Sequence, residues 1–226
     1  MPKPETLVIP GLGSPESPLY EKVYHLLTAE ARRRDMPMRC LKYKGHGHLT
    51  GGRIDGKIEL PGVAQGIVDA VRQAPPGSIL ICRSFGCLLP GYLALNHRLR
   101  LQDFRRIAFW GPVPYFHMWK LFGTAAQVAE KNSEAEAKGA KLAPDFFQSI
   151  VPLEVSCKSL LDVEVIIAVG TADGYTTPAF ADFLAAMVRE AGNADVHVRI
   201  VENAPHEMTA AQDEKVKADY LNSLFG

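Results

Sequence analysis

Three side chains with the chemistry of nucleophilic catalysis follow three β-rich runs of the chain. Ser84 ends the run ILICRS, and Asp173 and His206 follow the later runs VEVIIAV and DVHVRIV. A serine hydroxyl is a poor nucleophile unless a base takes its proton, and histidine is the usual base near neutral pH. An aspartate can fix the tautomer of that histidine and stabilise its protonated form. The three residues are therefore candidates for one catalytic site, if the fold brings them together.

Short β-rich segments alternate with longer segments of helical periodicity along most of the chain. We expect strands at residues 6–9, 38–43, 78–82, 105–110, 163–169 and 195–201. We expect helices at 17–34, 62–74, 86–97, 178–191 and about 208–224. This alternation predicts an α/β fold with a mostly parallel sheet of about six strands and helices on both faces. Sites in such sheets gather beyond the carboxyl ends of the strands, where Ser84, Asp173 and His206 fall.

The chain is expected to form one domain. Its 226 residues, 47% of them hydrophobic, are sufficient for a single buried core. Residues 111–161 contain no expected strand, and 125–141 reads as a polar helix. Long connections in compact domains are usually functional, so residues 112–160 are predicted to form a small helical lid over the strand ends. The alternative is a solvated excursion from the domain.

Composition excludes several classes of partner. Lysine plus arginine equal aspartate plus glutamate at 25 each, so the chain lacks the basic field of a nucleic-acid binder. No apolar run approaches the roughly 18 residues of a membrane helix, and the N-terminus does not resemble a signal peptide. The four cysteines include no C-x-x-C pair, which suits a reducing compartment. We therefore expect a cytoplasmic protein that acts on a small molecule.

The motifs, taken in their order, resemble those of the α/β-hydrolase family of serine hydrolases. CRSFG (82–86) stands where the family has its G-x-S-x-G turn, and serine, acid, histidine is the family's chain order. GTADGYTTP (170–178) resembles the acid loop, KGHGHLTGG (44–52) the Gly-His-Gly loop, and VIPGLGS (8–14) the oxyanion loop. The resemblance covers about residues 6–222 but lacks the two antiparallel strands that many members carry at the start. It implies the α/β-hydrolase fold and hydrolysis of an ester, thioester or amide without a cofactor.

The resemblance also assigns roles to individual residues. Ser84 would be the nucleophile, His206 the base, and Asp173 the acid that orients the histidine. The backbone amides of Leu12 and Phe85 would form the oxyanion hole. A non-catalytic ligand-binding protein of the same fold, or a lyase or cofactor-free peroxidase that uses the same site, remain alternatives, because a fold does not determine a function.

The sequence departs from the family pattern at three positions. Cys82 replaces the first glycine of the turn, and Arg83 stands where members often have histidine. Pro178 falls one residue later after the aspartate than is usual, so the acid loop is expected to have a different shape. Asp162 is the fallback acid.

Other side chains suggest weaker alternatives. His46 and His48 could bind a metal, but the sequence offers no clear third ligand. Cys82 and Cys87 lie in apolar surroundings, where cysteine usually packs as a small hydrophobe. A cysteine nucleophile is not expected, because the residue at the turn itself is serine. No metal is therefore predicted.

The segment WGPVPYFHMWKLF (110–122) holds five aromatic residues, including both tryptophans of the chain. Trp110, Phe116 and Trp119, together with Tyr175 of the acid loop, are predicted to contact a substrate that carries a bulky or aromatic group. The alternative is that the aromatic segment anchors the lid to the core.

Arg83 is predicted to select an anionic substrate, because it precedes the nucleophile at the mouth of the expected site. Lys44 and Arg53 could add to a local positive field, and a guanidinium can hold a carboxylate by two parallel hydrogen bonds. The alternative is that Arg83 packs on the aromatic segment or pairs with an acid such as Glu202.

Overall fold

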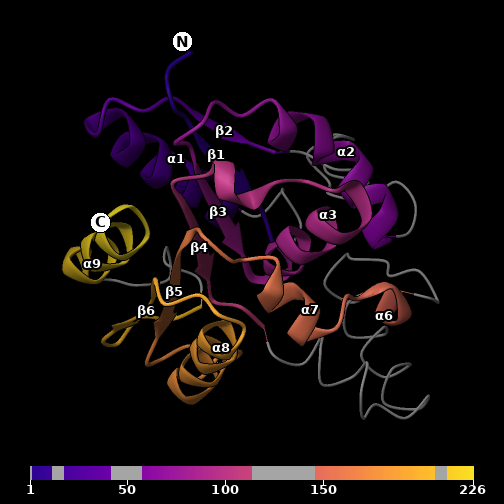
Figure 1. Cartoon of the computed structure of the whole chain (residues 1–226). Coiled ribbons are helices and arrows are strands. Elements are labelled where there is room, and N and C mark those ends of the chain that lie inside the picture. The colour runs from indigo at the N-terminus through magenta and orange to yellow at the C-terminus, as the bar shows by residue number, and fades with distance from the viewer. Residues whose placement is uncertain (1, 12–17, 42–57, 114–145, 207–212) are drawn as a thin grey trace.

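A parallel sheet of six strands forms the centre of the molecule (Figure 1). The computed structural model describes residues 2–11, 18–41, 58–113, 146–206 and 213–226. The sheet order is β2-β1-β3-β4-β5-β6, and every neighbouring pair is parallel. The strands are β1 (Thr6–Ile9), β2 (Met38–Cys40), β3 (Ile79–Arg83), β4 (Arg106–Trp110), β5 (Glu164–Gly170) and β6 (Val196–Val201). The predicted parallel sheet is confirmed.

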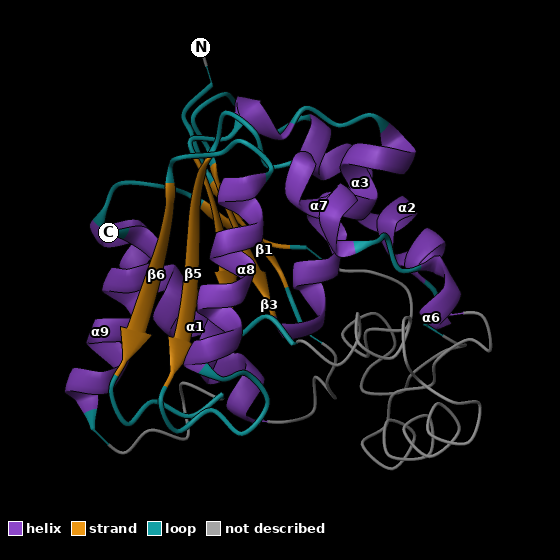
Figure 2. Ribbon diagram, turned by 60° about the horizontal axis from the view of Figure 1, so that its bottom comes forward, coloured by secondary structure: helices purple, strands orange, loops and turns teal. Residues whose placement is uncertain are grey.

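Helices cover both faces of the sheet, as Figure 2 shows. One face packs against α1 (Pro18–Arg33) and α9 (Glu214–Phe225). The other face packs against α2 (Leu60–Arg72), α3 (Leu89–His97) and α8 (Pro178–Glu190). Because side chains alternate along a strand, Ile79 and Ile81 face the α1–α9 layer, whereas Leu80 and Cys82 face the other layer.

Local sequence explains where several helices begin. Thr177 caps α8 by accepting a hydrogen bond from the Phe180 amide at 3.2 Å, and Pro178 occupies the first turn, where a missing N–H costs nothing. Asp213 caps α9 through the Lys215 amide. The helix predicted over 86–97 is instead a 3₁₀ helix, η2 (Ser84–Leu88), followed by α3. The chain therefore begins to coil at Ser84 itself.

The segment predicted as a lid is described only in its last part. That part contains α6 (Phe146–Ser149) and α7 (Leu153–Lys158), and α7 packs against α3. Residues 114–145, with the polar helix predicted at 125–141, lie outside the described residues. Within the described ranges, no helix is both long enough and apolar enough to cross a membrane.

Candidate active site

Ser84 lies on a sharp turn at the carboxyl end of β3. Its φ angle is +49°, in the left-handed region that residues other than glycine seldom adopt. Gly86 permits this turn, because a Cβ at that position would lie 2.5 Å from the Ile9 carbonyl oxygen and 2.8 Å from that of Pro10. The turn therefore presses against the end of β1. Strain of this kind concentrates at functional sites, where it aims a side chain.

Neighbouring contacts hold the turn in place. The Cys87 thiol donates a hydrogen bond to the Cys82 carbonyl oxygen at 3.0 Å, and Cys82 is fully buried. Phe85 is also buried and stacks on Phe146, with 5.8 Å between the ring centres. The Phe85 amide lies in the first turn of η2. Leu12 lies outside the described residues, so the oxyanion hole formed with Leu12 stays a prediction.

Asp173 and His206 form a buried pair beyond the ends of β5 and β6. His206 Nδ1 lies 2.8 Å from Asp173 Oδ2, and both side chains are almost inaccessible to solvent. The second carboxylate oxygen, Oδ1, accepts hydrogen bonds from the amides of Tyr175 at 2.7 Å and Thr176 at 2.9 Å. The Thr176 hydroxyl donates to the Pro112 carbonyl oxygen at 2.9 Å. Because the acid engages Nδ1, the other ring nitrogen, Nε2, is available to exchange a proton with a serine.

Gly111 connects this pair to Ser84. Arg83 and Trp110 are partners across β3 and β4, so the residues that follow them, Ser84 and Gly111, leave adjacent strands at the same edge. A Cβ at Gly111, whose φ angle is +55°, would lie 2.9 Å from His206 Cε1 and 3.3 Å from Asp173 Oδ2. The imidazole therefore packs directly on the glycine backbone beside the turn. Gly111 was not among the residues predicted from the sequence, although a glycine immediately after a strand would have indicated it.

Tyr175 lies at the outer side of the histidine. Its ring meets the His206 ring edge-on at 4.9 Å between centres, and 48% of the residue is exposed. The structure thus brings four of the predicted site residues, Ser84, Asp173, His206 and Tyr175, to one edge of the sheet.

Arg83 and Trp110 lie elsewhere. Arg83 is 2% exposed, and its guanidinium carbon lies 5.1 Å from the centre of the Trp110 ring. Trp110 in turn packs against Tyr220 of α9, with 5.6 Å between ring centres, on the α1–α9 side of the sheet. Glu202 is exposed and accepts a hydrogen bond from the Thr171 hydroxyl. This placement corrects the prediction that Arg83 stands at the mouth of the site and favours the alternative of aromatic packing.

The remaining predicted residues divide into two groups. Phe116, Trp119, Lys44, Arg53 and the histidines at 46 and 48 lie outside the described residues. Asp162, the fallback acid, is exposed and precedes β5, whereas Asp173 follows that strand. It therefore lies at the opposite edge of the sheet from His206. Across the described ranges, no group of three or more potential metal ligands comes together.

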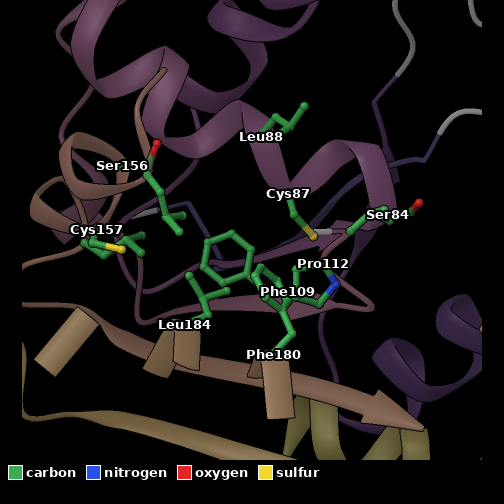
Figure 3. A pocket seen from close by; sticks show the side chains of 12 residues that line it. Ser84, Cys87, Leu88, Phe109, Pro112, Ser156, Cys157, Phe180 and Leu184 are labelled. Carbon is green, nitrogen blue, oxygen red and sulfur yellow. The ribbon is translucent and has the colours of Figure 1, made fainter. Parts of the chain in front are cut away.

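A pocket opens beside Ser84, on the α3–α8 side of the sheet (Figure 3). Its walls come from η2, from the end of β4 and the segment after it, from α7 with Leu160, and from α8. The lining residues are Ser84, Cys87, Leu88, Phe109, Pro112, Val113, Leu153, Ser156, Cys157, Leu160, Phe180 and Leu184. Neither Arg83 nor Trp110 is among them.

The two cysteines that line the pocket remain thiols. All four cysteines of the chain are free. Burial raises the pKa of Cys157 to about 11 and raises the pKa of Cys87 and Cys82 further. Since the thiolate is the reactive form, these side chains contribute packing and shape rather than a second nucleophile.

Solved structures with a similar fold span nearly the whole chain. α/β-Hydrolase domain-containing protein 10 from mouse superposes with a TM-score of 0.64 at 16% identity, over 98% of this chain and 88% of that one. Est1E from Butyrivibrio proteoclasticus gives 0.63 at 12% identity over 99% and 90%. A monoacylglycerol lipase from Paleococcus ferrophilus gives 0.61 at 15% identity over 97% and 93%. The chain has the α/β-hydrolase fold. No protein-family model matches it, and no curated protein matches it in sequence.

Proposed function

We propose that the protein is a serine hydrolase that cleaves an ester, thioester or amide through an acyl-enzyme on Ser84. The observation that carries this proposal is a serine at a φ angle of +49°, on a turn beside a buried aspartate–histidine pair. The names of proteins with similar folds, among them a lipase, an esterase and a deformylase, agree with a hydrolase of this kind.

In the first half of the reaction, Ser84 Oγ forms a bond to the carbonyl carbon of the substrate, and its proton passes to His206 Nε2. The carbonyl electron pair moves onto oxygen, which the amides of Phe85 and Leu12 would stabilise. When this pair returns, the bond to the leaving group breaks, and His206 gives its proton to the departing atom. Asp173 stabilises the charged imidazole throughout through the 2.8 Å contact with Nδ1.

In the second half, water attacks the acyl-enzyme and passes a proton to His206 Nε2. The bond between the acyl carbon and Ser84 Oγ then breaks, and the proton returns to Oγ. The net reaction consumes one water and releases a carboxylic acid and the leaving group.

The substrate proposal keeps the bulky or aromatic group predicted from the sequence. An aromatic leaving group could pack against the half-exposed ring of Tyr175, which meets the histidine that must protonate that group. Four free cysteines agree with a cytoplasmic location, which is also part of the proposal.

The test is labelling by a fluorophosphonate probe together with turnover of p-nitrophenyl esters. The wild-type protein should label at one serine, and Ser84→Ala should abolish labelling and lower kcat by about 10⁴–10⁶-fold. Ser223→Ala, which removes a hydroxyl on α9, is the matched control and should leave both readouts unchanged. A folded wild-type protein that neither labels nor turns over an ester would favour the non-catalytic binding protein instead.

A further inference from the structure

The pocket beside Ser84 is bounded on all its described sides by apolar groups or uncharged short side chains. Phe109, Pro112 and Val113 come from the segment at the end of β4, whereas Phe180 and Leu184 come from α8. No lysine, arginine, aspartate, glutamate or histidine is among the described lining residues. An ionised group placed here would lose its hydration without gaining a charged partner. The pocket therefore suits an uncharged aliphatic chain.

The far end of the pocket is fixed by a close contact between two helices. Figure 3 shows Ser84 at one end and Ser156 and Cys157 of α7 at the other. Ser156 packs directly on Gly91 of α3, because a Cβ at Gly91 would lie 2.4 Å from Ser156 Oγ and 2.9 Å from Ser156 Cα. The two helices cannot approach further, so this contact fixes α7, whose Ser156 and Cys157 form this end of the pocket.

The size of the pocket sets the length of chain that it can hold. Its volume is about 40 Å³, and a single water needs roughly 10–15 Å³ on the same measure. The pocket thus has room for about three water-sized groups. A methylene or methyl group is similar in size to a water molecule, so about three carbons fit beyond the reacting carbonyl.

The position of His206 decides which part of the substrate enters this pocket. The leaving group must lie within reach of His206 Nε2, because the histidine protonates it. Neither His206 nor its neighbours Asp173 and Tyr175 line the pocket. The pocket is therefore on the other side of the carbonyl carbon from the leaving group, where the acyl chain extends.

We propose that this pocket binds a short, uncharged aliphatic acyl group of about four carbons, counted with the carbonyl. The proposal rests on the proposed serine hydrolase activity and names its acyl substrate class. It also places the bulky or aromatic group of the substrate in the leaving group, on the side of Tyr175. Recognition comes from the apolar walls and from the length limit set by Ser156 and Cys157 of α7, which packs on Gly91 of α3.

The experiment measures kcat/KM for p-nitrophenyl esters with acyl chains of two to twelve carbons. In the wild-type protein, kcat/KM should rise about fourfold for each methylene that enters the pocket. It should peak near four carbons and fall beyond that length. An ester of succinate, which carries a carboxylate on a chain of the same length, should react at least about tenfold more slowly than the butyrate ester.

Two substitutions at Leu184 should move this peak in opposite directions. Leu184→Ala enlarges the pocket and should shift the optimum to longer chains, whereas Leu184→Phe should shift it toward acetate. Opposite shifts cannot arise from general destabilisation, which would lower all rates together. Leu95→Ala is the matched control, because Leu95 is 54% exposed on α3, and its chain-length profile should equal that of the wild-type protein.

The outcomes separate the two proposals. If the wild-type protein labels with the fluorophosphonate but both folded Leu184 variants keep the wild-type chain-length profile, the acyl pocket is wrong and the serine hydrolase stands. A faster reaction with the succinate ester than with the butyrate ester would also contradict the acyl pocket and leave the serine hydrolase proposal intact. If the wild-type protein neither labels nor hydrolyses any ester, the hydrolase proposal fails, and the acyl assignment is overturned with it.

Discussion

Gly111 is the residue on which the imidazole of His206 rests. The ring occupies the space that a side chain at this position would fill, and the Gly111 amide donates to the Ala168 carbonyl oxygen at 2.9 Å. Gly111 therefore fixes the histidine relative to the sheet. We regard it as a positioning residue, since it touches the aspartate–histidine pair and has no group that takes part in the reaction.

Replacing Gly111 by alanine should separate the histidine from the serine. The new methyl group would lie 2.9 Å from His206 Cε1, and the φ angle of +55° is itself unfavourable for alanine. A displacement of about 1 Å in a catalytic group can cost about 100-fold in rate, so we expect a loss of that order in kcat. Steady-state kinetics on a butyrate ester would measure the loss, with circular dichroism to confirm the fold.

Gly174→Ala is the control for this substitution. Gly174 lies one residue after Asp173, yet a Cβ there would meet no atom within 4 Å. Its activity should stay within about twofold of wild type. Equal activity in the two folded variants would contradict the positioning role of Gly111.

Asp173 offers a second test at the scale of one residue. Asparagine has only one side-chain oxygen, and its other terminal group is an NH2 that donates. In Asp173→Asn the side chain therefore cannot accept both from the two loop amides and from His206 Nδ1–H. The histidine would then lose its fixed tautomer, and kcat should fall by about 10⁴-fold. The measurement is turnover of the same ester together with the rate of fluorophosphonate labelling.

Asp162→Asn is the matched control for that change. Asp162 is exposed before β5 and has a φ angle of +60°, which asparagine tolerates well. We expect nearly wild-type kinetics. A large loss of kcat in Asp162→Asn with a small loss of kcat in Asp173→Asn would show that Asp162, and not Asp173, is the acid that orients His206.

At the scale of elements, continuous apolar runs made the strands predictable. Runs such as VIIAV are buried on both faces of a parallel sheet, and their strands begin and end within a few residues of the predicted positions. The chain segments that supply Ser84 and Asp173 follow such strands, and His206 follows the alternating strand β6, so their common edge was predictable as well. The contact of His206 with Gly111 was not, because it joins loops that are far apart in the sequence.

The position of Arg83 shows where the argument from sequence failed. Proximity to Ser84 suggested the mouth of the site, but neighbouring side chains of a strand point to opposite faces. Arg83 follows Ile79 and Ile81 onto the α1–α9 face, where its guanidinium lies over Trp110. Ser84 does not follow this alternation, because the chain leaves the strand geometry and turns at that residue. The alternation of side chains along β3 would have placed Arg83 on the correct face. The geometry of the turn at Ser84 could not be predicted in this way, because it does not follow that alternation.

The third prediction concerns the charge selectivity assigned to Arg83. Arg83→Met should lower kcat/KM equally, within about twofold, for an ester with a carboxylate and for its neutral partner. The reason is that the guanidinium packs beneath the turn, across the sheet from the pocket, and supports the backbone on which Ser84 stands. Kinetics on the matched ester pair would decide. A loss confined to the acidic ester would restore the original assignment.

At the scale of the whole molecule, the order of the sheet assembles the site. The strands β3, β4, β5 and β6 are consecutive neighbours, and adjacent strands lie about 4.8 Å apart. Ser84 and Gly111 directly follow β3 and β4, and Asp173 and His206 lie in the loops after β5 and β6. The serine and the acid therefore leave the sheet two strands apart, with Gly111 between them, and the loop after the next strand returns His206 over the glycine.

The helical layer over the pocket supplies the last prediction. Gly91→Ala would place a methyl group 2.4 Å from Ser156 Oγ, so α7 must move away from α3. Overpacking of this kind typically costs about 1–3 kcal/mol of unfolding free energy. Because α7 carries Ser156 and Cys157 of the pocket wall, the preference for a four-carbon acyl group should weaken in the same variant. Urea unfolding and the chain-length profile are the two measurements.

The double variant Gly91→Ala with Ser156→Gly tests whether both effects share this one contact. Removing the Ser156 side chain relieves the shortest approach and leaves the 2.9 Å approach to its Cα, so part of the stability should return. Residues in direct contact typically couple by about 0.5–3 kcal/mol in such a cycle. Coupling of that size, with part of the acyl preference restored, would tie the end of the pocket to the packing of α7 on α3. Strictly additive losses would show that the pocket is closed by some other contact.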